Sequence, residues 1–433
     1  MRSSPVPGPF RRDLEDPRER HRRGSPGLRR VNLALFVAGL TTFMSLYCTQ
    51  ALLPALSASF RVSPTTSSLL VSLTTGTLAL AVIPVSALSE RFGRTRVMLV
   101  SSAIAAPLGL LIPLCPSFPA LAAVRAVQGV ALAGVPAVAM AYLADEVHPE
   151  ALGGAMGRYI AGNTVGGLAG RLLPGFVTDL AGWRWGLAAT ALAVTLLTAA
   201  FWALLPRSRF FTPSRPGLGG LARHLADPGM RRLYVVGLVL MAMFVTVYNY
   251  LGYRLIASPF GLPESVVALV FLMYLAGTFS SPVAGSLADR IGRRRVLLGA
   301  CALAACGLLL TLPDSLPAVG AGLLVMTTGF FAAHTVASGW VGRRATTAKA
   351  HASALYLFAY YLGSSVGGSA GGLAYEHGHW AATVVYGVAL LAVALVAAVG
   401  VRVSAGGGRV RGPVGTTAAA DRTGVMSITP PRQ

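Results

Sequence analysis

Three arginines lie inside long apolar stretches of the sequence, where a charged side chain is costly. Arg125 lies about six residues, or roughly 9 Å of helix, from the end of its stretch, and Arg171 lies at a similar depth in another. A guanidinium group at such a depth in a membrane normally faces a cavity or a polar partner, so both residues are candidates for binding a solute. Arg254 lies nearer the end of its stretch, and its side chain could instead extend to the membrane surface.

Carboxylates do not lie clearly inside any of these stretches. The nearest acids are at their ends or between them: Asp145, Glu146, Asp179, Glu264, Asp314 and Glu376. A transporter of cationic solutes usually has a buried carboxylate that attracts the cation and exchanges it for a proton. Because the fixed charges here would be positive, we expect an anionic or polar neutral solute, held partly by Arg125 and Arg171.

Further polar and aromatic side chains share faces at helical spacing, which favours a mixed binding pocket. The full set of candidate substrate or coupling residues is Arg125, Gln128, Arg171, Asn163, Tyr47, Gln50, Asn249, Tyr253, Arg254, His334, Tyr356 and Tyr360. The alternative for the tyrosines and amides is a role at the membrane interface or in hydrogen bonds between helices. His334 could carry a proton, because imidazole titrates near neutrality, or it could be a hydrogen-bonded histidine of the core.

The composition requires that most of the chain faces lipid. Of the 433 residues, 54% are hydrophobic and 12% are charged, whereas soluble domains carry about 25% charged residues. The net charge of +21 does not indicate a nucleic-acid partner, because the basic residues form short clusters between apolar stretches rather than one basic face. The composition therefore makes the lipid bilayer the expected partner and excludes nucleic acid. We also expect a monomer.

The sequence shows no pattern that indicates catalysis, a metal or a cofactor. Its four cysteines lie in or beside apolar stretches and form no closely spaced pair, so we expect them to be small buried side chains. There is no phosphate-binding loop, nucleophile elbow or HExxH pattern. We therefore expect neither an enzyme nor an ATP-driven pump, with no cofactor and no metal site.

Twelve apolar runs of about 20 residues, the length that crosses a bilayer, must position the candidate residues. The first six lie near 32–58, 66–88, 97–114, 119–143, 153–177 and 184–205. The second six lie near 233–257, 265–288, 296–313, 317–341, 352–375 and 381–402. The predicted fold class is an all-α membrane protein of twelve transmembrane helices in two six-helix bundles.

Arg-rich segments divide the chain and give its orientation. We expect a disordered cytoplasmic tail at 1–30, a bundle at 31–205, a cytoplasmic linker at 206–232, a bundle at 233–402 and a disordered tail at 403–433. Alternate loops between the runs carry clustered basic residues, whereas the opposite loops carry almost only Arg61. Positively charged loops stay in the cytoplasm, so both termini of this multi-pass protein are predicted to be cytoplasmic, and no cleaved signal is needed.

Two pairs of similar segments recur at nearly the same interval. The segment from Tyr159 to Leu172 matches the one that begins at Tyr360, 201 residues later. The segment from Ser86 to Arg94 matches the one that begins at Gly285, 199 residues later. Because each copy belongs to a unit of six runs, the halves are predicted to be parallel repeats with a cavity between them near the membrane midplane.

Glycines in the first of these segments repeat every four residues and therefore share one helix face. They are Gly162, Gly166 and Gly170 in the first copy and Gly363, Gly367 and Gly371 in the second. Small residues at this spacing let helices in lipid pack closely, and a sliding gate at the same glycines is a further possibility. The copies differ at Arg171, whose counterpart is Gly372, and we expect substrate or coupling chemistry where the symmetry is broken.

These motifs carry a family resemblance. Gly285, Asp289, Arg290, Gly292, Arg293 and Arg294 resemble the loop motif of the major facilitator superfamily, and the first copy departs from it with Ser86 and Glu90. Arg125, Gln128 and Gly129 resemble the fourth-helix motif, and the fifth run resembles the antiporter motif, with departures at Gly167 and Arg171. The match covers roughly residues 31–402. A closer likeness, to the YnfM-type bacterial inner-membrane transport proteins, is carried by Leu33–Phe36, Tyr47–Cys48, Gly162–Arg171, Asn249–Arg254, Phe330–His334 and Tyr356–Ser365. It implies that the protein lies in the bacterial inner membrane.

The resemblance implies alternating access driven by an ion gradient, often by proton antiport. It also implies that the loop motifs form a conformational latch, whose candidate residues are Glu90, Arg91, Gly93, Arg94, Asp145, Glu146, Gly285, Asp289, Arg290, Gly292 and Arg293. An acid of the motif can interact with a helix N-terminus, where the helix dipole favours an anion. The alternative is a solvated, positively charged loop with no part in gating.

The sequence therefore favours a secondary transporter that exports a small organic solute in exchange for protons. An uptake symporter on the same fold is the second hypothesis, because the antiporter-like run lacks its usual proline at Gly167. A membrane sensor that transports nothing is a third and would be expected to carry an ordered soluble domain.

Overall fold

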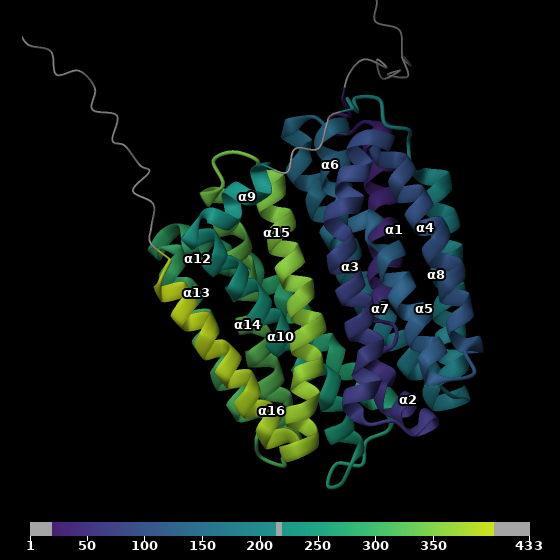
Figure 1. Ribbon diagram of the computed structural model, residues 1–433, viewed down its shortest axis with the longest axis vertical. Coiled ribbons are helices and arrows are strands. Elements are labelled where there is room, and N and C mark those ends of the chain that lie inside the picture. Colours follow the sequence, from purple (N-terminus) through teal and green to yellow (C-terminus); the bar gives the residue numbers. More distant parts are fainter. Residues whose placement is uncertain (1–19, 214–218, 402–433) are drawn as a thin grey trace, which may run out of the picture. The chain divides into compact units, whose positions relative to one another are not determined.

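The computed structural model describes residues 20–213 and 219–401, and these residues form helices and connecting turns. The first six crossings (Figure 1) are α1 (Pro26–Tyr47) with η1 (Gln50–Leu52) and α2 (Leu53–Phe60), α3 (Pro64–Phe92), α4 (Arg94–Leu111) with η2 (Ile112–Leu114), α5 (Phe118–Leu132) with α6 (Gly134–Glu146), α7 (Pro149–Ala181) and α8 (Trp183–Leu204). We refer to these as the N-bundle.

The second six crossings follow the short helix α9 (Gly219–Ala226). They are α10 (Pro228–Ile256), α11 (Glu264–Ala268) with η3 (Leu269–Leu275) and α12 (Ala276–Ile291), α13 (Arg293–Leu310), α14 (Leu316–Arg344), α15 (Lys349–Leu362) with η4 (Gly363–Gly367) and the first part of α16 (Gly368–Val399), and the rest of α16. We refer to these as the C-bundle.

The prediction of an all-α membrane protein with twelve crossings is confirmed. Within residues 20–213 and 219–401, nine segments are long and apolar enough to cross a membrane. One of them, His351–Val399, contains two crossings, because Gly378 and His379 leave the helical conformation inside α16. The two remaining crossings are α7 and α13; α13 begins with three arginines, which lower its apolar character.

The boundaries of the polar segments differ in part from the sequence prediction. Residues 20–30, expected within a disordered tail, are ordered: α1 begins at Pro26, capped by Ser25, and His21 pairs with the backbone beside Val147. The predicted linker at 206–232 likewise contains α9 and the start of α10. The remainder of the tail at 1–30 and all of 403–433 lie outside the described residues.

The first crossing is broken in the middle, and the sequence explains where. Pro54 removes one backbone donor, and its ring would clash with the carbonyl group four residues earlier in a continuous helix. The chain responds by ending α1 at Tyr47 and passing through a 3₁₀ turn at Gln50–Leu52 before α2 begins. The last carbonyl groups of α1 therefore have no partner further along a regular helix.

The glycine stripe lies where two helices touch in each bundle. A methyl group on Gly162, Gly166 or Gly170 of α7 would come within 2.2–2.4 Å of backbone oxygens of α1. In the C-bundle, Gly363 and Gly367 make equally close approaches to α10. The repeat seen in the sequence is thus a repeat of the same helix contact, α1 with α7 and α10 with η4 and α16.

We expect Gly166→Ala to destabilise the protein, because its methyl group would lie 2.2 Å from the carbonyl oxygen of Leu40. Overpacking of this kind costs about 1–3 kcal/mol or more, which exceeds the ~1 kcal/mol that alanine gains in helix propensity. The measurement is the thermal unfolding midpoint of the purified protein in detergent. Gly157→Ala on the same helix is the matched control, since a methyl group there meets nothing within 4 Å. Equal midpoints for both variants would contradict this account of the packing.

Candidate functional site

A cavity of about 330 Å³ lies between the two bundles. From the N-bundle it is lined by Phe43, Tyr47, Pro136, Met140, Tyr159, Ile160, Asn163, Thr164, Gly167 and Arg171. From the C-bundle it is lined by Met241, Phe244, Tyr274, Phe330, Phe331, His334, Leu357, Tyr360 and Tyr361. Its walls are largely apolar and aromatic with a few polar groups, which is the usual make-up of a small-molecule site.

Arg171 carries the single permanent charge among the described residues that line this cavity. Its guanidinium carbon lies 4.1 Å from the ring centre of Tyr47, 5.0 Å from that of Phe271 and 4.7 Å from that of Tyr274. Cation–π contacts of this kind stabilise a desolvated cation by up to about 2 kcal/mol each. The three rings therefore stabilise a guanidinium group that is 2% exposed and has no carboxylate partner among the described residues.

Hydrogen bonds fix the guanidinium group of Arg171 and connect it to the C-bundle. Its Nε donates to Gln50 Oε1 at 2.8 Å, and a second nitrogen donates to the carbonyl oxygen of Gly167 in the preceding turn. Gln50 Nε2 in turn donates to Asn249 Oδ1 of α10 at 2.8 Å. The predicted residues Arg171, Gln50, Asn249 and Tyr47 are thus brought together, and of these Arg171 and Tyr47 line the cavity whereas Gln50 and Asn249 do not.

Hydrogen bonds between the bundles gather on the side of the membrane with few arginines in its loops, although α3 also packs against α15 further toward the opposite side. The Tyr253 hydroxyl donates to the carbonyl oxygen of Leu53 at 2.9 Å, and the Thr65 amide donates to Glu376 at 3.0 Å. Ser265 also donates to Asp179 on this side. The cavity extends from Arg171 in the opposite direction, toward Tyr159 and Leu357, which lie nearer the Arg-rich loops.

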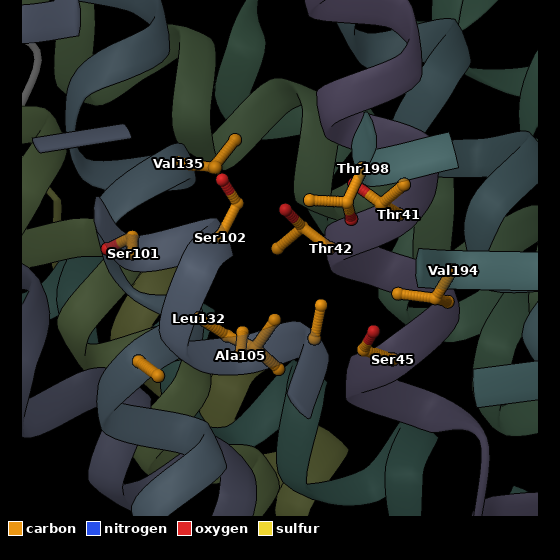
Figure 2. A pocket seen from close by; sticks show the side chains of 12 residues that line it. Thr41, Thr42, Ser45, Ser101, Ser102, Ala105, Leu132, Val135, Val194 and Thr198 are labelled. Carbon is orange, nitrogen blue, oxygen red and sulfur yellow. The ribbon is translucent and has the colours of Figure 1, made fainter. Parts of the chain in front are cut away.

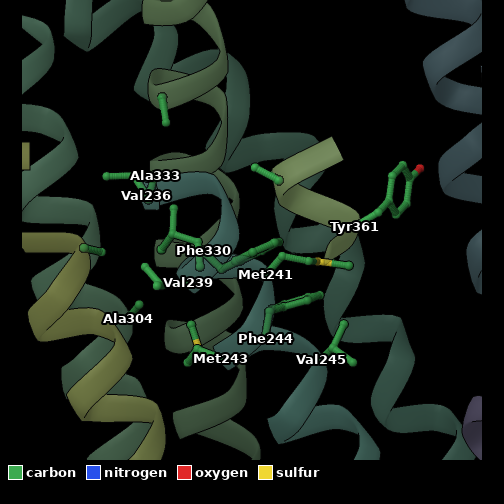
Figure 3. Packing of buried hydrophobic residues seen from close by; sticks show 14 of the residues in the cluster. Val236, Val239, Met241, Met243, Phe244, Val245, Ala304, Phe330, Ala333 and Tyr361 are labelled. Carbon is green, nitrogen blue, oxygen red and sulfur yellow. The ribbon is translucent and has the colours of Figure 1, made fainter. Parts of the chain in front are cut away.

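The C-bundle wall of the cavity is a layer of stacked aromatic rings. Phe244 stacks on Phe330 with ring centres 3.7 Å apart, and Figure 3 shows both rings beside Met241. The His334 ring lies parallel to Phe330, with ring centres 6.0 Å apart, and 4.7 Å from Tyr360. Its Nδ1 forms a hydrogen bond of 3.0 Å with the Tyr356 hydroxyl. Three further predicted residues, His334, Tyr356 and Tyr360, therefore form one cluster.

Arg125, in contrast, does not line the cavity, and its predicted contact with substrate is not supported. The side chain is 0% exposed inside the N-bundle. It donates to the carbonyl oxygens of Ser45 (2.8 Å), Leu46 (2.6 Å) and Leu70 (3.1 Å) and to Gln128 Oε1 (2.6 Å). Since Ser45 and Leu46 belong to the last turn of α1, Arg125 serves to hold the broken first crossing against α3 and α5.

Two more candidates have structural partners away from the cavity. Arg254 pairs with Asp314 at 2.9 Å and donates to the carbonyl oxygens at the end of α13, including that of Pro313. This explains its position without snorkelling. Gln128 bridges Arg125 and the carbonyl oxygen of Ala105. Asn163 does line the cavity, and its buried Oδ1 has no hydrogen-bond partner in the described structure.

The latch candidates of the N-bundle form a compact charged cluster at the Arg-rich side. Arg94 pairs with Glu90 at 2.7 Å and with Asp145 at 3.3 Å, so three of the predicted residues meet. Glu146 was expected as a pairing charge for the same cluster. It instead accepts hydrogen bonds from Ser208 and from the backbone amides of residues 209 and 210, and thereby holds the segment after α8.

The second copy of the loop repeats this arrangement within the C-bundle. Asp289 pairs with Arg293 at 2.7 Å and with Arg343 at 3.1 Å. Gly93 and Gly292 both have φ of +95° at the turn between two helices, a conformation that favours glycine. The side chains of Arg91 and Arg290 are exposed, and Gly285 has open space beside it. The ion pairs described here each join residues of one bundle.

Sequence reasoning missed the aromatic residues that complete the site. Phe271 and Tyr274 lie three residues apart in the 3₁₀ segment η3, where side chains at this spacing eclipse each other and both rings can face Arg171. Phe330 and Phe331 precede His334 by one turn of α14. The cluster of aromatic residues around a candidate histidine was visible in the sequence, but the direction in which the rings face was not.

A second cavity, in the N-bundle, is too small for an organic solute. Figure 2 shows the hydroxyl groups of Thr41, Thr42, Ser45 and Ser102 around it, and its volume is about 10 Å³. Thr41 and Thr42 donate to the carbonyl oxygen of Ala38 in their own helix. The space is close to the minimum for one water molecule, so the cavity between the two bundles is the candidate solute site.

Twelve crossings in two repeated bundles, with a cavity between them, define a multi-pass membrane transporter. The family model described as Major Facilitator Superfamily matches residues 35–255 and 233–419. The chain belongs to this superfamily and is a secondary transporter.

The relatives of known sequence include bacterial transport proteins. The chain is 42% identical over 396 residues to inner membrane transport protein YnfM of Escherichia coli (strain K12), covering 90% of this chain and 95% of that protein. It is 39% identical to the uncharacterized MFS-type transporter YybF of Bacillus subtilis (strain 168), covering 86% and 94% of the two chains. These matches support a multi-pass protein of the inner membrane.

Solved structures show the same fold at low sequence identity. A bacterial homolog of the human lysosomal transporter Spinster superposes with a TM-score of 0.72 at 16% identity, covering 87% of this chain and 98% of that one. A mutant of the nucleoside transporter NupG superposes with a TM-score of 0.67 at 13% identity, covering 85% and 98%. At these identities the likeness extends to the fold alone.

Proposed function

We propose that this transporter exports a small organic anion from the cytoplasm in exchange for protons by alternating access. The observation that carries the proposal is the environment of Arg171: the cavity is lined by this cation and by no aspartate or glutamate among the described residues. An anionic substrate would supply the missing negative charge. The surrounding rings would contact its apolar body, which favours a solute with both features.

Arg171 has a free donor for such a ligand. Its Nε and Nη1 are used by Gln50 and Gly167, and Nη2 makes no hydrogen bond to the described residues. A hydrogen bond between a guanidinium group and an anionic oxygen is stronger than one between neutral groups. Because Gln50 also contacts Asn249 of the C-bundle, an anion that competes for Arg171 would weaken a contact between the bundles.

The contacts between the bundles support an inward-facing state. The hydrogen bonds among them gather near the loops with few arginines, while the Arg-rich loops belong to the cytoplasm by the positive-inside rule. Both termini would then be cytoplasmic, and the cavity would receive its solute from that side. Opening would require the outer contacts to break and the charged clusters at Arg94 and Arg293 to rearrange, with each bundle moving as a unit.

We expect His334→Gln to uncouple transport from the proton gradient. Among the described residues that line the cavity, His334 is the titratable side chain besides the tyrosines and Arg171. Glutamine keeps a hydrogen-bonding group at this position but does not titrate. With one proton exchanged and the membrane potential held at zero, a one-unit pH gradient can drive about tenfold accumulation. The variant should show none, while solute exchange at equal pH continues. His377→Gln, at an exposed helix end, should behave as wild type. Gradient-driven accumulation by His334→Gln would exclude this residue as the proton carrier.

Flux measurements in proteoliposomes test the proposal as a whole. The panel holds solutes of similar size and fixed charge: benzenesulfonate as the anion, phenyl glucoside as the neutral solute and benzyltrimethylammonium as the cation. We expect flux of the anion, coupled to proton movement in the opposite direction. Anion flux in the same direction as protons would favour the uptake symporter.

The remaining outcomes would contradict the proposal. Flux of the cation alone would overturn the assignment of an anionic substrate. A lack of flux for all three solutes, from protein that is folded and correctly inserted, would favour the membrane sensor. If one class of solute moves, the panel can be extended with further solutes of that class.

A further inference from the structure

A second large recess lies in the C-bundle, separate from the central cavity. It has a volume of about 670 Å³ and is formed by α12, α13 and α14, which lie together in Figure 1. Its lining residues are Ala276, Phe279, Ser280, Val283, Ala284, Leu287, Ile291, Arg295, Val296, Gly299, Ala300, Leu303, Leu324, Thr328 and Ala332. None of these residues lines the central cavity, so the two spaces are distinct.

The recess is a groove with a floor of small residues and rims of large apolar ones. Ala284 and Ala300 on the floor are 5% and 6% exposed, whereas Phe279 and Val283 on the rim are 75% and 65% exposed. In a chain that crosses a bilayer, exposed apolar rims of this kind face hydrocarbon rather than water. The groove must therefore be filled by something apolar from the membrane.

The length and the charged end of the groove indicate what fills it. From Ala276 to Ile291 the groove extends about 22 Å along α12. This exceeds the thickness of one leaflet, which is half of a hydrocarbon core of ~30 Å. Its end at the Arg-rich side carries Arg295, whose side chain is exposed at the membrane boundary. An apolar channel that ends in a cation at the headgroup level matches a lipid whose acyl chain is apolar and whose headgroup is anionic.

The N-bundle provides an internal comparison. Across the repeat interval of 199 residues, Arg295 corresponds to Arg96, which is also exposed. Gly299, however, corresponds to Val100, whose branched side chain occupies the equivalent position. A methyl group on Gly299 would meet nothing within 4 Å, so the glycine leaves open space in the groove. The arginine is thus common to both halves, whereas the open space beside Gly299 is a feature of the C-bundle.

We propose that this groove binds one anionic phospholipid of the cytoplasmic leaflet, with its acyl chain against Gly299 and Ala300 and its headgroup at Arg295. The assignment to the cytoplasmic leaflet rests on the orientation proposed above, but the binding itself does not. A second copy of the chain is a less suitable occupant, because 670 Å³ spread over about 22 Å leaves a cross-section of about 30 Å², smaller than that of a helix of ~10 Å diameter. The site would stabilise the C-bundle and is independent of the solute.

The test is native mass spectrometry of the purified full-length protein after incubation with phosphatidylglycerol or phosphatidylcholine of identical acyl chains. We expect the wild type to retain one phosphatidylglycerol, in preference to phosphatidylcholine by about fivefold, the ratio that corresponds to ~1 kcal/mol for one basic residue near the surface. Arg295→Gln should remove the preference, whereas the matched variant Arg96→Gln should keep it.

A second pair of variants tests the apolar part of the site. Gly299→Leu fills the groove and should abolish retention of both lipids, whereas Val100→Leu at the equivalent lipid-facing position should not. The unfolding midpoint in lipid-free detergent shows whether Gly299→Leu remains folded, and an unchanged midpoint makes its loss of lipid specific. Retention of lipid by a folded Gly299→Leu variant would overturn the proposal.

Two further results would also overturn it. Equal retention of the two lipids by the wild type, or equal effects of Arg295→Gln and Arg96→Gln, would show that the groove has no anion-selective site. A dimer that dissociates on Gly299→Leu would assign the groove to a second copy of the chain instead.

Discussion

Replacement of Arg171 by lysine is expected to leave the protein folded and to weaken binding of an organic anion by about 10- to 100-fold. This is the effect of losing one hydrogen bond to a charged group, which contributes about 1.5–3 kcal/mol. Lysine keeps the positive charge, but its compact ammonium group cannot stack on Tyr47 and Tyr274 while it donates to Gln50. Arg171→Gln, which also removes the charge, should have a larger effect. The measurements are the dissociation constant and the flux of benzenesulfonate.

The matched control for this prediction is Arg254→Lys. Arg254 is also a buried arginine under aromatic rings, those of Phe260 and Trp380, but it pairs with Asp314 and does not line the cavity. This variant should bind the anion as the wild type does. Wild-type affinity in Arg171→Lys, or an equal loss in both variants, would mean that the environment of Arg171 does not recognise the substrate.

Replacement of Arg125 by glutamine is expected to have the opposite result: loss of folded protein rather than loss of a binding step. Glutamine is too short to reach Ser45, Leu46 and Leu70 together, and a buried carbonyl group left without its donor costs about 1–3 kcal/mol. Several such losses are comparable with a total stability of about 5–15 kcal/mol. The measurement is the yield of monodisperse protein from detergent and its unfolding midpoint.

A comparison of the two variants separates function from stability. Arg171→Gln should be recovered at wild-type yield without anion binding, and Arg125→Gln should be recovered poorly. Any Arg125→Gln protein that remains folded should keep its affinity for the anion, because this side chain lies outside the cavity. Normal yield together with lost binding in Arg125→Gln would return Arg125 to the substrate site.

The broken symmetry between the halves has a physical explanation in the structure. The counterpart of Arg171 is Gly372, where a side chain would meet the Tyr250 hydroxyl at 2.3 Å and Thr65 of α3. At this position the C-bundle therefore makes a close contact with its neighbours, while the N-bundle places a cation in the cavity. One repeat thus has a cation in the cavity, and the other has a close contact between the bundles at the equivalent position.

Much of the fold is determined by local features of the sequence. The bilayer requires runs of about 20 apolar residues, so the twelve crossings can be counted without knowledge of their packing. Glycines four residues apart identify a helix face that packs closely, and the same spacing in both halves shows which helices are equivalent. The loop motif around Asp289 and its first copy at Glu90 identify the family for the same reason, because they are short continuous segments.

The candidate site depended on tertiary structure, because hydropathy gives the depth of a residue but not the direction in which its helix faces. Arg125 and Arg171 lie at similar depths, and the sequence treats them alike. The first crossing is broken near Pro54, and Arg125 donates hydrogen bonds to the carbonyl groups that the break leaves free. Arg171 lies on a face of α7 that contacts Phe271 and Tyr274 of the other bundle. The sequence alone determined that this chain is a two-fold repeated membrane transporter with charged residues at depth. Long-range packing decided which of those charges faces the cavity between the bundles, since the rotation of each helix is set by its packing against its neighbours.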